Sequence, residues 1–120
     1  DHDRHPMPYI AITTESSFLT ALSNGSDFKT VFSRQIEALG NPGDVLIAIS
    51  TSGNSDNVIE AVMMANKMSM KVIILTGESG GKLNNSGDVV INIPSNDTQR
   101  IQEGHLLTEH ILCEMVESAL

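Results

Sequence analysis

Four short runs of β-branched and other apolar residues constrain the fold of this 120-residue chain more than any other feature of its sequence. They occupy residues 9–13 (YIAIT), 45–49 (VLIAI), 71–75 (KVIIL) and 89–93 (VVINI). Each run has the length of a strand. The middle two are almost continuously apolar, which is typical of strands covered on both faces in a parallel sheet. The runs therefore predict a four-stranded parallel sheet.

Segments with helical spacing of apolar residues separate or follow these runs, at 28–39, 56–70 and 98–120. Gly40 and the Asn-Pro-Gly-Asp sequence after it predict the end of the first helix. The alternation predicts a single α/β domain over residues 1–120, a doubly wound parallel sheet with helices on both faces. Because the first strand lies so near the start and few helices are available as cover, we expect an N-terminal part of the domain to be missing.

The charge balance excludes several classes of partner. Seven Lys and Arg against fifteen Asp and Glu give a net charge of −8, which disfavours binding to nucleic acid or to an anionic membrane. No apolar run approaches the roughly 20 residues that span a bilayer. The single cysteine, Cys113, cannot form an internal disulfide, so we expect a cytoplasmic protein in which Cys113 is a buried structural thiol.

Four hydroxyl side chains lie within six residues after the second predicted strand. The segment reads Ser50, Thr51, Ser52, Gly53, Asn54 and Ser55, and it leads into a predicted helix. Ligands of open α/β sheets bind beyond the carboxyl ends of the strands, and a helix N-terminus favours an anion. The pattern is neither a nucleotide P-loop nor a nucleophile elbow. It predicts phosphate binding; the alternative is an ordinary N-cap formed by Asn54 or Ser55.

Two further segments carry polar groups. The loop 77–81 (GESGG) follows the third strand and is expected to be a structural turn, with ligand contact as the alternative. On the last helix, Gln102 and His110 lie about 80° apart around the axis but about 12 Å apart along it. His105 and His110 diverge by about 140°. Spacing alone therefore favours a solvated polar face over a metal site.

Three segments together resemble a known family. They are 43–55 (GDVLIAISTSGNS), 75–81 (LTGESGG) and 100–105 (RIQEGH), the last followed by His110. In this order and spacing they resemble the sugar isomerase (SIS) domain. The similarity is greatest to the phosphoheptose isomerases, which interconvert sedoheptulose 7-phosphate and a glycero-manno-heptose 7-phosphate. It extends over essentially the whole chain and implies an SIS-type α/β fold.

The resemblance also implies roles for individual residues. It places Ser50, Thr51, Ser52 and Ser55 on the sugar phosphate, and Asn24 in the substrate site. Gln102 would contact the substrate and a bound zinc ion, and His110 would be a zinc ligand and the catalytic acid or base. The family's other zinc ligands, a His and a Glu, lie on an N-terminal helix that is not in this sequence. The family forms homotetramers.

The function predicted on this basis is aldose–ketose isomerisation of a heptose phosphate through an enediol. One alternative is a non-catalytic SIS relative that binds the bacterial replication initiator protein; another is a regulatory domain that binds a sugar phosphate. His110 favours the enzyme. Gly25 favours the initiator-binding relative, because the family usually has an aspartate there that helps to hold the sugar.

Overall fold

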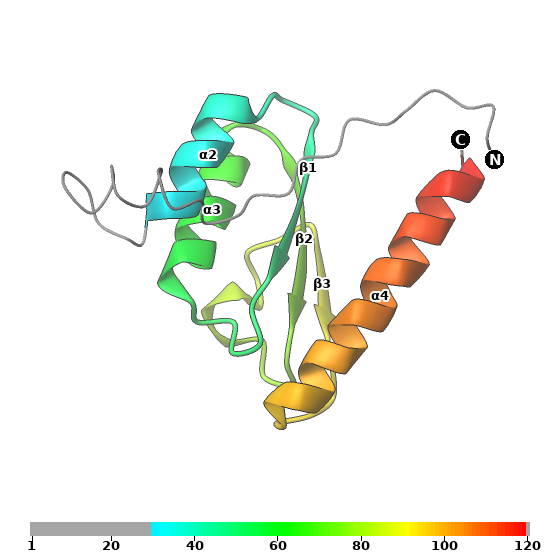
Figure 1. Cartoon of the computed structure of the whole chain (residues 1–120). Helices are drawn as coiled ribbons and strands as arrows, with labels where there is room; N and C mark the ends of the chain where they lie inside the picture. The colour runs from blue at the N-terminus through cyan, green and yellow to red at the C-terminus, as the bar shows by residue number, and fades with distance from the viewer. Residues whose placement is uncertain (1–29, 120) are drawn as a thin grey trace.

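A computed structural model describes residues 30–119 of the chain. Helix α2 is followed by alternating strands and helices and by the long helix α4 (Figure 1). The elements are α2 (Val31–Leu39), β1 (Val45–Ile49), α3 (Asp56–Lys67), β2 (Lys71–Thr76), the 3₁₀ turn η2 (Gly81–Leu83), β3 (Val89–Asn92) and α4 (Thr98–Ala119). Three of the four predicted strands are thus confirmed, and the run at 9–13 lies outside the described residues. Helix α3 ends earlier than predicted because Ser69 adopts a left-handed φ of 62°.

The three strands form one parallel sheet in the order β1-β2-β3. Val45 pairs with Lys71 at one end of the β1–β2 ladder, and Ile73 pairs with Val89 at the start of the β2–β3 ladder. Because all strands run in the same direction, their carboxyl ends meet at one edge of the sheet. The predicted α/β class is confirmed, and this edge carries the hydroxyl-rich segment 50–55 and the glycine-rich loop 77–81.

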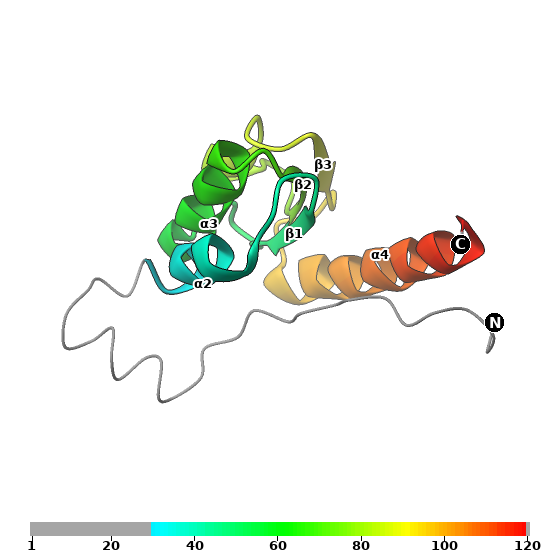
Figure 2. The same ribbon diagram turned by 90° about the horizontal axis from the view of Figure 1, so that it is seen from above.

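The main core lies between the sheet and the helices α2 and α3, which lie together on one side of it (Figure 2). It is built by Ile36 from α2, Val62 from α3, and Val72 and Ile74 from β2, each no more than 2% exposed. Burying an aliphatic side chain of this size contributes about 1.5–3 kcal/mol. This layer therefore fixes β1, α3 and β2, the elements that carry the two loops at the carboxyl edge.

Helix α4 lies on the opposite side of the sheet and diverges from it towards its C-terminal end (Figures 1 and 2). Only its first turns are seated, since Ile101 and His105 are its only buried residues. Most apolar residues further along the helix are exposed, among them Leu107, Ile111, Met115 and Val116. Cys113 is exposed too, so its prediction as a buried thiol is wrong for this chain. Neither α4 nor any other helix within residues 30–119 is long and apolar enough to cross a membrane.

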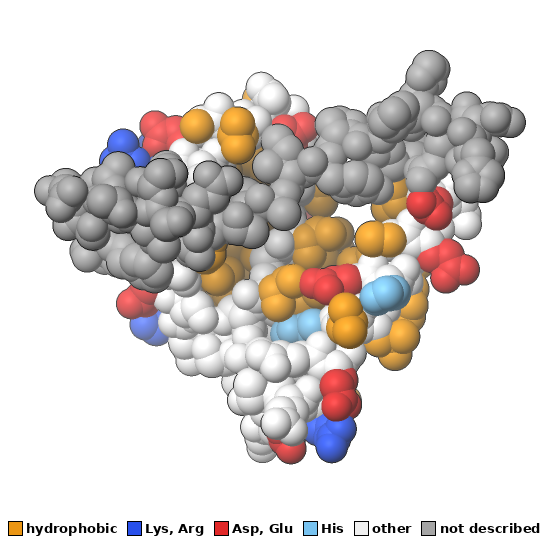
Figure 3. Space-filling model, viewed as in Figure 1, with side chains coloured by type: hydrophobic (Ala, Val, Ile, Leu, Met, Phe, Trp, Pro, Cys, Tyr) orange, Lys and Arg blue, Asp and Glu red, His pale blue; other side chains and the backbone are white. Residues whose placement is uncertain are grey.

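Strand β1 also departs from the prediction that the two apolar runs are covered on both faces. Its side chains Val45, Ile47 and Ile49 are 41–57% exposed on the face away from α2 and α3. The reason is geometric: β1 is the edge strand of the described sheet, and α4 packs more closely on β2 than on β1. Hydrophobic side chains consequently reach the surface beside α4 (Figure 3). Strand β2, by contrast, is buried over most of its length as predicted.

Candidate phosphate-binding site

The hydroxyl-rich segment 50–55 connects the carboxyl end of β1 to the first turn of α3. Its first two residues are held by two backbone hydrogen bonds. The N–H of Ser50 donates to the carbonyl of Leu75 at 3.0 Å, and the carbonyl of Thr51 accepts from the N–H of Gly77 at 3.1 Å. Both bonds join the segment to β2 and the residue that follows it. The segment is therefore fixed relative to the edge of the sheet where ligands of this fold class bind.

The hydroxyl groups of the segment form a network of their own. Ser50 Oγ lies 2.9 Å from Ser55 Oγ and accepts the N–H of Gly53 at 3.1 Å, while Ser52 Oγ accepts the N–H of Asn54 at 3.0 Å. Ser55 occupies the N-cap position of α3, but its hydroxyl makes no capping hydrogen bond. The structure therefore does not show the ordinary side-chain cap that was the alternative interpretation of this segment.

The first turn of α3 presents backbone donors beside these hydroxyls. By helix geometry the N–H groups of Asp56 and Asn57 have no intrahelical acceptor, and the helix dipole adds partial positive charge at this end. Val58 N–H is satisfied locally by the side chain of Asn57, at 2.9 Å. Hydroxyls and free N–H groups at a helix N-terminus together form an arrangement that can hold a phosphate.

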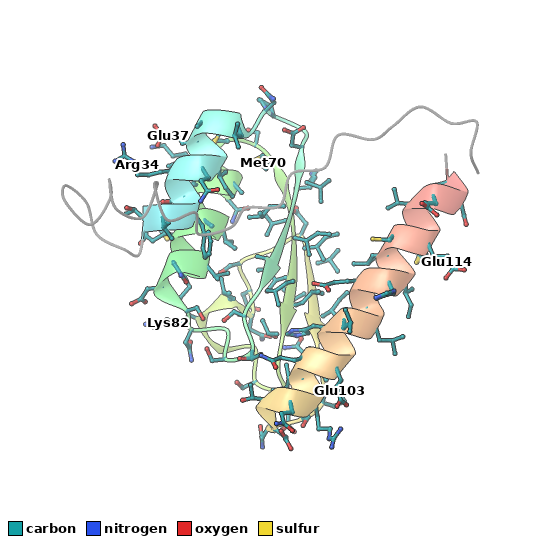
Figure 4. All side chains as sticks on the ribbon, in the orientation of Figure 1. Arg34, Glu37, Met70, Lys82, Glu103 and Glu114 are labelled. Carbon is teal, nitrogen blue, oxygen red and sulfur yellow. The ribbon has the colours of Figure 1, made fainter. Side chains whose placement is uncertain are left out.

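The glycine-rich loop after β2 packs directly against the hydroxyl-rich segment. Leu83 N–H donates to the Gly53 carbonyl at 3.1 Å, and Lys82 N–H donates to Asn54 Oδ1 at 2.8 Å. Gly53 has a φ of +70°, and a Cβ built on it would lie 2.0 Å from the Gly80 carbonyl oxygen. These contacts are consistent with the structural role predicted for the loop 77–81. Lys82 is seen near the N-terminal end of α3 (Figure 4).

The arginine side chain on α4 contributes little to this edge of the sheet. Arg100, at the start of α4, forms a bidentate pair with Glu103 at 2.7 and 2.8 Å, and both side chains are more than 60% exposed. Asp56 adds a carboxylate to the first turn of α3. An anion bound here would therefore be held by hydroxyl and backbone N–H groups rather than by a guanidinium group.

Gln102 and His110, the α4 residues predicted for substrate and zinc, are both exposed. They lie eight residues apart on one helix, which corresponds to about 12 Å along the axis. Residues 30–119 contain no group of three or more His, Cys, Asp or Glu side chains that could hold a metal ion. These two side chains alone do not fit a tetrahedral zinc site. Asn24 lies outside the described residues.

His105, which helical spacing grouped with His110 on a solvated polar face, is instead a buried residue. It is 3% exposed, and its Nε2 lies 2.8 Å from the carbonyl oxygen of Thr76 at the end of β2. A signal was available, since His105 follows the buried Ile101 by four residues and so shares its helix face. The structure thus places a buried polar group between α4 and the strand end that leads into loop 77–81.

The sheet, helices and loops define an α/β domain with a candidate anion-binding site at the carboxyl edge of the sheet. Comparison with known proteins identifies the family. The model of the SIS domain matches residues 2–77, more than half of the chain. The chain therefore belongs to the SIS domain family, as its motifs predicted.

Curated relatives and solved structures agree with this assignment. Phosphoheptose isomerases of Aromatoleum aromaticum and Thiobacillus denitrificans are each 52% identical to the chain, covering 98% and 100% of it. The structure of phosphoheptose isomerase from Neisseria gonorrhoeae matches 91% of the chain with a TM-score of 0.84 and 50% identity. That from Francisella tularensis matches 98% with a TM-score of 0.89 and 41% identity. The chain spans about three fifths of the length of these relatives, between 61% and 63%.

Proposed function

We propose that this chain belongs to an aldose–ketose isomerase that interconverts sedoheptulose 7-phosphate and a glycero-manno-heptose 7-phosphate. The observation that carries the proposal is the hydroxyl-rich segment Ser50–Ser55, held at the carboxyl edge of the sheet and facing the first turn of α3. The similarity to proteins named phosphoheptose isomerase supports a heptose phosphate as the substrate. In this proposal Ser50, Thr51, Ser52 and Ser55 surround the phosphate.

The proposed reaction moves a proton between adjacent carbons of the open-chain sugar. A base removes the proton from the carbon beside the carbonyl group while the carbonyl oxygen gains one, and a neutral enediol results. The second enediol hydroxyl then loses its proton as the neighbouring carbon regains one, so atoms and electrons balance. General acid–base catalysis of this kind contributes about 10²–10⁴-fold. His110 is the acid–base group that we assign from this chain, with a carboxylate partner from outside residues 30–119.

We further propose three properties that the family resemblance implies. Gln102 and His110 contribute to a zinc site only in combination with ligands from outside residues 30–119. The active form is a homotetramer, and the protein acts in the cytoplasm. The exposed apolar side chains along α4, among them Leu107, Ile111 and Met115, support burial of this helix in an assembly. Metal analysis and the mass of the purified intact protein in solution test the first two properties.

The phosphate site gives a prediction on binding affinity. Replacing Ser52 and Ser55 together by alanine removes two hydroxyl groups of the network at the first turn of α3. A hydrogen bond to a charged group contributes about 1.5–3 kcal/mol, so we expect the affinity for the sugar phosphate to fall at least about tenfold. Isothermal titration calorimetry of the intact protein measures this change.

The matched control is Ser118→Ala, which removes an exposed serine hydroxyl near the end of α4, far from the segment in the sequence. It should leave the affinity unchanged. If the double variant binds the sugar phosphate as tightly as the unmodified protein, residues 50–55 do not hold the phosphate.

A further inference from the structure

His105 is a buried polar residue that the proposed reaction does not use, and its position on α4 is unusual. Of the 22 residues of this helix, only Ile101 and His105 are buried. Ile101 packs at Gly77, where an added Cβ would lie 2.7 Å from its Cδ1 atom. Gly104 lies against Ile93 in the same manner. The helix is therefore seated on the sheet through about one turn, and His105 makes the hydrogen bond within that turn.

The acceptor of this bond belongs to a chain of contacts that reaches the phosphate segment. The Thr76 carbonyl accepts both His105 Nε2 at 2.8 Å and the N–H of Ile93 at 3.0 Å, which uses its two lone pairs. The next residue, Gly77, donates its N–H to the carbonyl of Thr51 at 3.1 Å. One peptide unit thus separates the anchor of α4 from the segment proposed to hold the phosphate.

The chemistry of the ring shows that the bond itself, rather than simple packing, distinguishes this side chain. Because a carbonyl can only accept, Nε2 must carry the proton that it shares with Thr76. His105 Nδ1 is buried and has no hydrogen-bond partner within residues 30–119. An unsatisfied buried nitrogen costs free energy that an apolar side chain of similar size would avoid. The stabilisation that a histidine provides at this position therefore comes from its hydrogen bond to the Thr76 carbonyl.

We infer that His105 is a positioning residue for the reaction proposed above: its bond to Thr76 sets where α4 stands relative to the phosphate segment. Gln102 precedes it by three residues and His110 follows it by five, so the anchor lies between them on the helix. A helix seated by one turn transmits any tilt at that turn to both side chains. The inference rests on the proposed function for its catalytic consequence, but the anchoring itself is separate from it.

The test compares His105→Leu with His105→Gln in the intact protein. Leucine fills the site without a donor, whereas the glutamine amide can donate to the Thr76 carbonyl. We expect His105→Leu to lower kcat about 10- to 100-fold, the loss produced by a displacement of about 1 Å, with KM changed less than about twofold. His105→Gln should restore kcat to within about threefold of the original.

Hydrogen exchange of the peptides covering residues 98–110 provides a readout that does not require turnover. We expect exchange there to be at least about tenfold faster in His105→Leu and close to the original in His105→Gln. Equal kcat and equal exchange in all three proteins would overturn the inference, as would a glutamine variant no better than leucine, or faster exchange with unchanged kcat. If the unmodified protein shows no isomerase activity, the proposed function fails and the exchange pattern alone decides whether His105 anchors α4.

Discussion

Replacing His110 by glutamine is expected to lower kcat for heptose 7-phosphate isomerisation about 10²–10⁴-fold, because it removes the acid–base group that α4 supplies to the reaction. Glutamine keeps a polar side chain on the exposed face of the helix but cannot exchange a proton near neutral pH. The affinity for inorganic phosphate should stay within about twofold, since the segment 50–55 is untouched. Steady-state kinetics and phosphate titration on the same preparation measure the two effects.

Glu114→Gln is the matched control for this variant. Glu114 lies exposed on the same helix, one turn beyond His110, and is labelled in Figure 4. Its substitution should leave both kcat and phosphate affinity unchanged. A His110→Gln protein that retains its full kcat would remove His110 from the proposed mechanism and leave this part of the chain without an assigned proton-transfer group.

The second large effect is expected from Gly53→Ala, which places a methyl group in the contact between the two loops. Both Gly53 and Gly43 have left-handed φ values, +70° and +87°, but nothing lies within 4 Å of a Cβ at Gly43. Gly43→Ala should therefore lower the free energy of unfolding by only about 1–2 kcal/mol, the strain of a left-handed alanine. Gly53→Ala should cost about 1–3 kcal/mol more, because the Gly80 backbone must move.

Chemical denaturation of the two variants measures the difference in stability, and phosphate titration adds an independent readout. Only Gly53→Ala should weaken phosphate binding, because the displaced Gly80 backbone is bonded through Lys82 and Leu83 to the phosphate segment. Equal losses of stability in both variants would show that the close packing of the two loops does not constrain the site.

The sequence predicted those parts of the fold that local patterns determine. The apolar runs at 45–49, 71–75 and 89–93 are strands, because short β-branched runs bounded by turn residues have few alternatives. The hydroxyl-rich segment was found because its residue types and its place after a strand are both visible in the chain. The detailed geometry of the segment could not be predicted, since the pairing of Ser50 with Ser55 depends on how the segment folds back on itself.

Features that depend on contacts between distant segments escaped prediction. The exposure of the apolar residues of α4 was not predicted, because periodicity shows which residues share a face but not what that face meets. The exposure of Ile47 on β1 has the same origin, as it depends on where α4 crosses the sheet. The burial of His105 was not predicted, because its partner is a backbone carbonyl 29 residues away. Such a partner leaves no pattern in the sequence.

Incubation of the intact protein with sedoheptulose 7-phosphate in D₂O, followed by proton NMR, tests the proposed isomerase activity directly. We expect conversion to the glycero-manno-heptose 7-phosphate, with deuterium entering the carbon that exchanges its proton in the enediol. A sugar phosphate that binds to the protein but stays chemically unchanged and free of deuterium would contradict it. In that case residues 50–55 would serve a binding protein rather than an isomerase.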